Sequence, residues 1–187
     1  MGRKIWFLTG NLGKVEEASE HLTPLGYEVN QLIVPKDAII EPQSDSITEV
    51  AMAKIEQAKS HLPGGIDSGD MLMIEDAGLF IDALSGFPGV YSSYVHETVG
   101  NQGMVRLLEH LQSDDPVMAK RLRSASFHAV AALWDGERIL FGRGECKGSI
   151  ASEIQGDGGF GYDPMFLANG DVGTYGEIDP AAKHASS

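Results

Sequence analysis

The sequence is poor in cysteine, in basic residues and in long hydrophobic runs. A single cysteine, Cys146, rules out an internal disulfide framework, so nothing in the chain requires an oxidising compartment. The longest early apolar run, residues 5–8, is far too short for a signal peptide or a membrane span. We therefore expect no membrane partner and a cytoplasmic location.

Basic residues are outnumbered by acidic ones. Only 14 Lys and Arg stand against 27 Asp and Glu, which gives a net charge of −13. Sequence-independent binding of nucleic acid needs a basic stripe, so no nucleic-acid partner is expected. If the ligand is an anion, a metal ion, a few lysines and backbone N–H groups must overcome this acidic surplus locally.

The remaining composition is that of a globular protein. Of the 187 residues, 42% are hydrophobic and 22% are charged, which predicts a sizeable core. At about 150 residues per domain, the length predicts one domain over residues 1–187.

Hydrophobic periodicity predicts an α/β fold with a mixed sheet and flanking helices. Strands are expected over residues 4–9, 27–34, 71–74, 124–134 and 137–146. Helices are expected where apolar residues recur at helical spacing, over residues 15–25, 47–58 and 104–111. Asp135-Gly136 between the last two strands is a hairpin signal, whereas the earlier units are of the parallel type.

The first candidate motif is TGNLGK, between the first predicted strand and the first predicted helix. It comprises Thr9, Gly10, Asn11, Leu12, Gly13 and Lys14. Free N–H groups at a helix start, together with a lysine, are suited to hold phosphate. A capped turn with a solvated lysine has the same pattern, and the segment matches neither a P-loop nor the dinucleotide fingerprint.

The second candidate is the carboxylate pair Glu75-Asp76, expected at the end of an apolar strand. Adjacent strand residues face opposite ways, so we expect only one of the two to enter a given cleft. Mg²⁺ is typically held by one or two carboxylates plus substrate phosphates, and Glu41 is the candidate second ligand. Solvent-exposed acids at a strand end are the alternative interpretation.

The third candidate is the glycine-rich segment GGFGYD, residues 158–163. Phe160 or Tyr162 is suited to stack on a flat ring, and Asp163 to accept hydrogen bonds from N–H donors. A tight turn that packs its aromatics into the core explains the segment equally well. We expect His128 to be a structural residue of a buried strand and Cys146 a small packed residue.

The three segments occur in an order that resembles a known family. TGNLGK, IEDAGL (74–79) with ALSGFPGVYS (83–92), and GDGGFGYDPMF (156–166) resemble the inosine/xanthosine triphosphate pyrophosphatase family. TYGEIDPAAKHASS (174–187) resembles that family's closing segment. The resemblance implies a homodimer of two-lobed α/β subunits with a central cleft. It also implies Mg²⁺-dependent hydrolysis of noncanonical purine nucleoside triphosphates (ITP, dITP, XTP) to the monophosphate and pyrophosphate, which clears them from the nucleotide pool.

The resemblance also implies roles for individual residues. Thr9, Gly10, Asn11, Leu12, Gly13 and Lys14 would bind the triphosphate, and Glu41 with Asp76 would hold Mg²⁺. Asp76 would also accept the proton of the attacking water. The base pocket would comprise Phe160, Gly161, Tyr162 and Asp163, and Lys183 would reach the nucleotide from the closing segment.

The sequence departs from the family pattern at two places. Ala77 stands at a substrate-binding position where relatives often have Ser or Thr, so a hydroxyl contact to phosphate is absent there. The family segment continues beyond the serine matched by Ser187 with His-Arg, which are expected to read the base. Either the chain is truncated there or the protein lacks this part of the pocket.

Two other functions remain open from the residues. A nonhydrolytic nucleotide sensor needs the same phosphate loop, but an intact pair of Glu41 and Asp76 argues against it. A related pyrophosphatase that acts on modified or pyrimidine nucleotides is the other alternative, and the FGYD segment favours purines over it.

Overall fold

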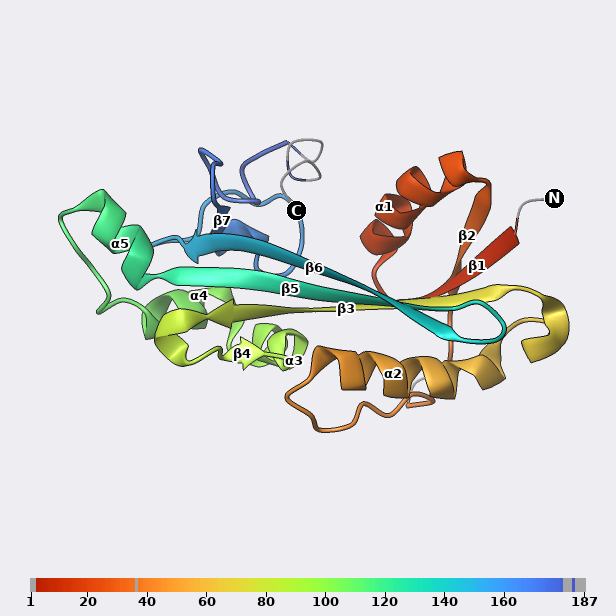
Figure 1. Ribbon diagram of the computed structural model, residues 1–187. Helices are drawn as coiled ribbons and strands as arrows, with labels where there is room; N and C mark the ends of the chain where they lie inside the picture. Colours follow the sequence, from red (N-terminus) through yellow and green to blue (C-terminus); the bar gives the residue numbers. More distant parts are fainter. Residues whose placement is uncertain (1–2, 36, 180–182, 184–187) are drawn as a thin grey trace. The chain divides into compact units, whose positions relative to one another are not determined.

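The computed structural model describes residues 3–35, 37–179 and 183, which form a seven-stranded sheet and five α-helices. The strands are β1 (Arg3–Leu8), β2 (Tyr27–Leu32), β3 (Met71–Ile81), β4 (Pro88–Gly89), β5 (Ser124–Trp134), β6 (Ile139–Ile150) and β7 (Phe166–Ala168). The helices are α1 (Leu12–Leu22), α2 (Ile47–Ala58), α3 (Ser92–Thr98), α4 (Gly100–Leu107) and α5 (Pro116–Leu122) (Figure 1).

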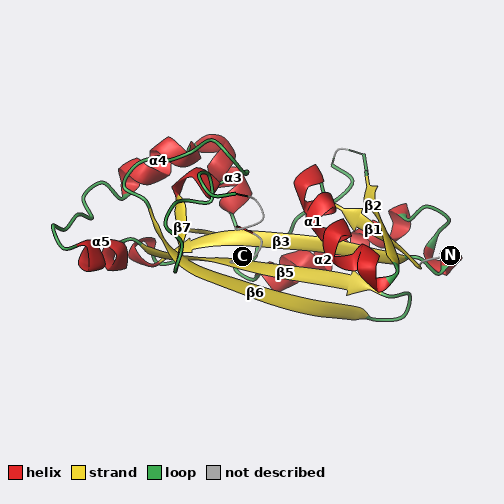
Figure 2. Cartoon of the chain, turned by 90° about the horizontal axis from the view of Figure 1, so that it is seen from above, coloured by secondary structure: helices red, strands yellow, loops and turns green. Residues whose placement is uncertain are grey.

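The sheet contains both parallel and antiparallel pairs. Its strand order is β2-β1-β3-β5-β6-β7 (Figure 2), and β4 pairs with β3 off this path. Strand β1 is parallel to β2 and β3, whereas β3–β4 and β6–β7 are antiparallel. This confirms the predicted α/β class with a mixed sheet and flanking helices.

The chain divides into two compact units, each built from two stretches of sequence. Unit 1 comprises Met1–Asp76 and Ala129–Arg143, and unit 2 comprises Ala77–His128 and Gly144–Ser187. The strands β3, β5 and β6 contribute residues to both units. A single domain with a central cleft stays a prediction.

In unit 1, helices α1 and α2 cover opposite faces of the strands (Figure 1). One stripe of α2, formed by Ala51, Ile55 and Ala58, is fully buried. This spacing places all three side chains on one side of the helix. They pack against residues of β2, β3 and β5, namely Leu32, Leu72, Ile74, Val130, Ala132 and Trp134.

In unit 2, the core lies between the strands and the helices α3 and α4. Its fully buried members include Leu79, Ile81, Met104, Leu108, Met165 and Phe166. The Arg123 side chain is also buried, and its guanidinium donates to the carbonyls of Leu108, Ile150 and Ala151 at 2.6, 2.8 and 2.6 Å. Burial lowers the pKa of Arg123. These three hydrogen bonds tie the end of β6, where the loop to residues 158–163 begins, to the end of α4.

The predicted strand 71–74 was too short, because β3 continues through Glu75 and Asp76 to Ile81. Leu79 and Ile81 are fully buried and extend the apolar alternation. Gly78 allows the close approach of β4, since a Cβ there would lie 2.4 Å from the Gly89 carbonyl oxygen. The two carboxylates therefore lie within a paired strand and not at its end.

Other predictions of local structure were also wrong. The first helix ends at Leu22, and Leu25 lies in a following 3₁₀ turn with 70% of its surface exposed. His128 lies in β5 and stacks on Phe80 at 4.4 Å, as expected of a structural residue, but its side chain is 43% exposed, so only the expected burial was wrong. Helices α3 and α5 were not predicted, because seven residues hold too few apolar repeats to show a helical period.

No helix in the described part of the chain combines the length and hydropathy needed to cross a membrane.

Candidate active site

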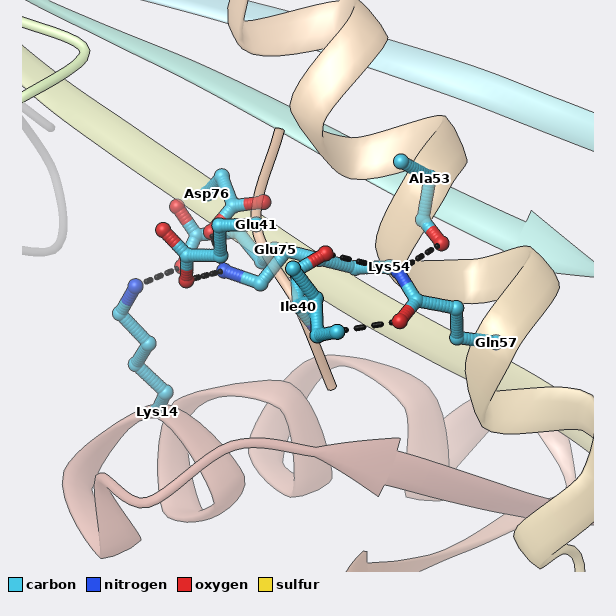
Figure 3. A network of polar contacts seen from close by, with 8 residues as sticks. All are labelled: Lys14, Ile40, Glu41, Ala53, Lys54, Gln57, Glu75 and Asp76. Atoms are coloured by element: carbon cyan, nitrogen blue, oxygen red, sulfur yellow. Dashed lines mark hydrogen bonds and ion pairs between the residues drawn. The ribbon is translucent and has the colours of Figure 1, made fainter. Parts of the chain in front are cut away.

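Two lysines and three carboxylates of unit 1 form two groups of ion pairs (Figure 3). Lys14, in the first turn of α1, pairs with Glu75 of β3. The Nζ atom of Lys54, on α2, lies 2.7 Å from Oε1 of Glu41 and 2.6 Å from Oδ1 of Asp76. These five residues, called the network below, come from a loop, two helices and a strand, and the two groups meet at the adjacent residues Glu75 and Asp76 of β3.

The sheet register brings the TGNLGK turn to this network. Leu8 at the end of β1 pairs with Ile74 of β3, so Thr9 and Glu75 follow paired residues on neighbouring parallel strands. Asn11 caps α1 by accepting a hydrogen bond from the Gly13 N–H at 2.9 Å. The interpretation as a capped turn is therefore confirmed, whereas Lys14 is held by Glu75 and is not a solvated lysine.

Glu75 and Asp76 contact different lysines. Glu75 pairs with Lys14, and Asp76 pairs with Lys54. The alternation of side chains along a strand accounts for this, because neighbouring residues point to opposite faces. The prediction that the two carboxylates face different ways is confirmed.

The sequence interpretation missed Lys54. Its position on α2 follows Val50 and precedes Ala58 by one turn each, and both neighbours are buried. Burial lowers the pKa of Lys54, but the carboxylates of Asp76 and Glu41 more than offset this effect, and the pKa is raised overall. A lysine within an otherwise apolar stripe was the signal that could have identified it.

The loop that carries Glu41 is fixed by Gln57, another residue that the sequence interpretation missed. The Gln57 side chain donates to the Ile40 carbonyl at 2.8 Å and accepts from the Ile40 N–H at 2.9 Å (Figure 3). The Glu41 side chain itself is 62% exposed. Its backbone is therefore positioned from α2, while its carboxylate remains accessible.

The oxygen ligands of unit 1 fit a small divalent cation. Within the described ranges, no three His, Cys, Asp or Glu side chains are arranged to hold a metal ion. Mg²⁺ needs only one or two carboxylates besides substrate oxygens. The Lys54 ammonium already bridges Glu41 and Asp76 as a stand-in cation, and Asp76 Oδ2 is buried without a hydrogen-bond partner among the described residues. Glu41 and Asp76 therefore fit the predicted role.

In unit 2, the loop containing Phe160 is organised around the buried carboxylate of Asp163. Its Oδ2 accepts from the Phe160 N–H at 2.8 Å and from Lys183 Nζ at 2.7 Å. Lys183 Nζ also lies 4.3 Å from the centre of the Phe160 ring. Gly159, at φ +70°, is required here because a Cβ would lie 2.0 Å from Asp163 Oδ2.

Tyr162 is an internal support of the same loop. Only 4% of its surface is exposed, its hydroxyl donates to the Ser92 carbonyl at 2.7 Å, and His96 packs edge-on against its ring. Burial raises the pKa of Tyr162 to about 12. Of the two predicted stacking residues, Phe160 is the accessible one, with 43% of its surface exposed.

The predicted site residues are divided between the two units. Thr9 to Lys14, Glu41 and Asp76 belong to unit 1, whereas Ala77, Phe160 to Asp163 and Lys183 belong to unit 2. Gly161 follows Phe160 in the loop of unit 2, and its carbonyl accepts a hydrogen bond from the Asn101 side chain at 3.0 Å. Ala77 is exposed. Ser187 lies outside the described residues.

Comparison with known proteins identifies the family. The sequence profile of the Ham1 family matches residues 5–187, and the chain belongs to this family. It is 41% identical to a dITP/XTP pyrophosphatase of Thermococcus kodakarensis over 184 residues, which cover 98% of this chain and 90% of that protein. A dITP/XTP pyrophosphatase of Methanopyrus kandleri is 39% identical over 94% of this chain and 84% of its own length. The predicted family relationship is confirmed.

Solved structures of the family have the same fold. A HAM1 protein from Coxiella burnetii has a TM-score of 0.78 and 31% identity, with 99% of this chain and 91% of that chain covered. The Ham1 protein of Staphylococcus aureus has a TM-score of 0.76 and 26% identity over the same shares of the two chains.

Proposed function

We propose that this protein hydrolyses noncanonical purine nucleoside triphosphates, namely dITP, ITP and XTP, to the monophosphate and pyrophosphate. The observation that carries the proposal is the network of Lys14, Glu41, Lys54, Glu75 and Asp76 beside the start of α1. It combines two ammonium groups for phosphate oxygens with carboxylates for a divalent cation. The names of the archaeal relatives support the same substrate class.

The charge of the network supports a role for a divalent cation. Its two lysines and three carboxylates carry a net charge of −1, in a protein whose net charge is −13. A triphosphate is itself strongly anionic, so the network by itself would repel it. Glu41 and Asp76 would hold Mg²⁺, which when bound neutralises phosphate charge and stabilises the leaving pyrophosphate. Lys14 and Lys54 would then bind phosphate oxygens.

Asp76 is suited to accept the proton of the attacking water. In the absence of metal its Oδ1 is bound by Lys54 at 2.6 Å. Its Oδ2 is buried and has no hydrogen-bond partner in the described part of the chain, so its lone pairs are available. A positioned base of this kind is typically worth about 10²–10⁴ in rate.

Unit 2 would select the base through Lys183. An ammonium group only donates hydrogen bonds, and hypoxanthine and xanthine present O6 as an acceptor, whereas adenine presents an amino group at this position. One mismatched buried hydrogen bond costs about 1–3 kcal/mol, so ATP would be rejected roughly 5-fold to 150-fold. Guanine shares O6 and must be rejected at its 2-position.

The test is to measure which phosphate product is released. The protein is incubated with dITP, XTP, dATP, dGTP and dCTP, with Mg²⁺ or with EDTA, and pyrophosphate and orthophosphate are assayed separately. We expect Mg²⁺-dependent release of pyrophosphate from dITP and XTP. Binding of dITP without release of either product would indicate a sensor, and a preference for dCTP would indicate a pyrimidine pyrophosphatase.

The assembly and location belong to the same proposal. The family resemblance supports a homodimer, which sedimentation equilibrium of the purified protein would test. The single cysteine and the nucleotide substrate support a location in the cytoplasm.

A further inference from the structure

The geometry points to a second role for Lys54, as a placeholder that occupies the metal position until the divalent cation arrives and is then released to phosphate. This inference rests on the proposed function and deepens it. Metal binding and triphosphate binding would be coupled through this one side chain. Before the metal binds, Lys54 would act by holding Glu41 and Asp76 in position.

The distances support a bridging cation. Lys54 Nζ lies 2.7 Å from Glu41 Oε1 and 2.6 Å from Asp76 Oδ1, so one ammonium contacts both proposed metal ligands (Figure 3). The two carboxylates come from a loop and a strand that are 35 residues apart in sequence. Without a cation between them, their like charges would repel and the exposed Glu41 side chain would turn to solvent. Lys54 therefore keeps the two ligands together while no metal is bound.

The same contacts make Lys54 a competitor of the metal. A divalent cation bound by Glu41 and Asp76 takes over the oxygens that now hold the ammonium, and two cations at one place repel each other. The lysine side chain is a point charge on a flexible stem, so it can swing away without movement of α2. Once displaced, its charge is available to a phosphate oxygen.

Competition and release predict effects of opposite sign when the charge is removed. In Lys54→Met, Mn²⁺ should bind to the nucleotide-free protein about tenfold more tightly than in the wild type, because a like charge has left the site. Inorganic pyrophosphate, measured at saturating Mg²⁺, should bind about tenfold more weakly, because a phosphate ligand is lost. A side chain with a merely structural role would weaken both.

Calorimetric titration of the nucleotide-free protein with MnCl₂ measures the first effect, and titration with pyrophosphate the second. Lys59→Met is the matched control, since Lys59 lies just beyond the end of α2 and pairs with Glu56 at 2.9 Å, so its loss removes the same charge from outside the network. It should leave Mn²⁺ affinity within about twofold of the wild type. Lys54→Arg should retain the weak Mn²⁺ binding of the wild type, and Lys54→Gln repeats the charge removal in case the methionine variant is unfolded.

The outcomes separate this inference from the proposed function. Mn²⁺ affinity that is unchanged or weaker in folded Lys54→Met and Lys54→Gln overturns the placeholder role alone. If Mn²⁺ binds neither the wild type nor these variants, and dITP yields no pyrophosphate, the metal site and the proposed function fail together. Tighter Mn²⁺ binding with weaker pyrophosphate binding supports the inference, and its loss in Glu41→Gln locates the ion.

Discussion

The two units hold their charged residues in different ways. In unit 1, the five charged side chains of the network pair with each other across a loop, two helices and a strand, and all of them except Glu41 are 18–22% exposed. In unit 2, the ion pair of Asp163 and Lys183 is more deeply buried, at 5% and 12% exposed, and the loop's own backbone binds the carboxylate. Side chains held only by each other can exchange partners when a ligand arrives, whereas a carboxylate held by its own loop stays in place.

This difference suggests a division of labour between the units. In the proposed function, the network of unit 1 would bind the metal ion and the polyanion. The loop of unit 2, whose Tyr162 and Asp163 are held by internal hydrogen bonds, would discriminate one flat ring from another. Substitutions in unit 1 should therefore affect turnover, and substitutions in unit 2 should affect stability and selectivity.

The largest effect is expected for Asp76→Asn in unit 1. An amide is a poor base and a weak metal ligand, so kcat for dITP should fall by about 10²–10⁴. Steady-state pyrophosphate release measures this change, with Glu56→Gln as the matched control because Glu56 pairs with Lys59 outside the network. A kcat close to that of the wild type would refute the role of Asp76.

The next effect concerns Tyr162 in unit 2 and appears only at alkaline pH. Its pKa is raised from 10.0 to about 12 in the folded protein, so between these values the native state keeps a proton that the unfolded chain has released. The free energy of unfolding should therefore fall as pH rises through this window, by about 2–3 kcal/mol for a two-unit difference. Urea unfolding at several pH values should show this loss in the wild type and not in Tyr162→Phe. Parallel pH curves for the two proteins would contradict the assignment.

A smaller effect is expected for Lys183→Met in unit 2. The variant loses the donor to O6, and the ratio of kcat/KM for dITP over dATP should fall by roughly 5-fold to 150-fold. The fall should come mainly from weaker dITP binding. If kcat alone decreased for both nucleotides and the ratio were unchanged, Lys183 would not read the base.

The smallest effect is expected for Gln57→Ala in unit 1. Loss of the two hydrogen bonds to Ile40 frees the loop that carries Glu41. At about 1 kcal/mol net, this should weaken Mn²⁺ binding roughly fivefold and leave the selectivity among bases unchanged. A change in the dITP to dATP ratio would show that the two units are not separable in this way.

Much of the candidate site could be predicted because its motifs are local. TGNLGK has a helix cap and a lysine within six residues. In GGFGYD, Gly159 is close in sequence to Asp163, whose carboxylate leaves no room for a Cβ at that glycine. Opposite orientations for Glu75 and Asp76 follow from the period of a strand. Each of these features depends on near neighbours in sequence.

The features that were missed depend on distant partners. The apolar stripe of α2 marks Lys54 as unusual, but its contact with Asp76, 22 positions away, is known only from the fold. Likewise, the sequence made Tyr162 a candidate for stacking. Its role as an internal support depends on the hydrogen bond that its hydroxyl donates to the carbonyl of Ser92, 70 positions away. The end of β3 was misplaced because a pair of carboxylates usually ends an apolar strand, and here the pairing with β4 and the buried Leu79 and Ile81 continue it.

The three hydrogen bonds of Arg123 have a consequence for how the protein responds to ionic strength. Their acceptors are carbonyl dipoles, so dissolved ions have no opposite charge to screen at this buried position. The partly exposed lysines of unit 1 face carboxylates, and chloride and sodium compete for both partners. Concentrated salt should therefore weaken the ion pairs of unit 1 while the loop beyond β6 stays anchored, and at high salt the protein would lose affinity for its proposed substrate before it loses its preference among bases.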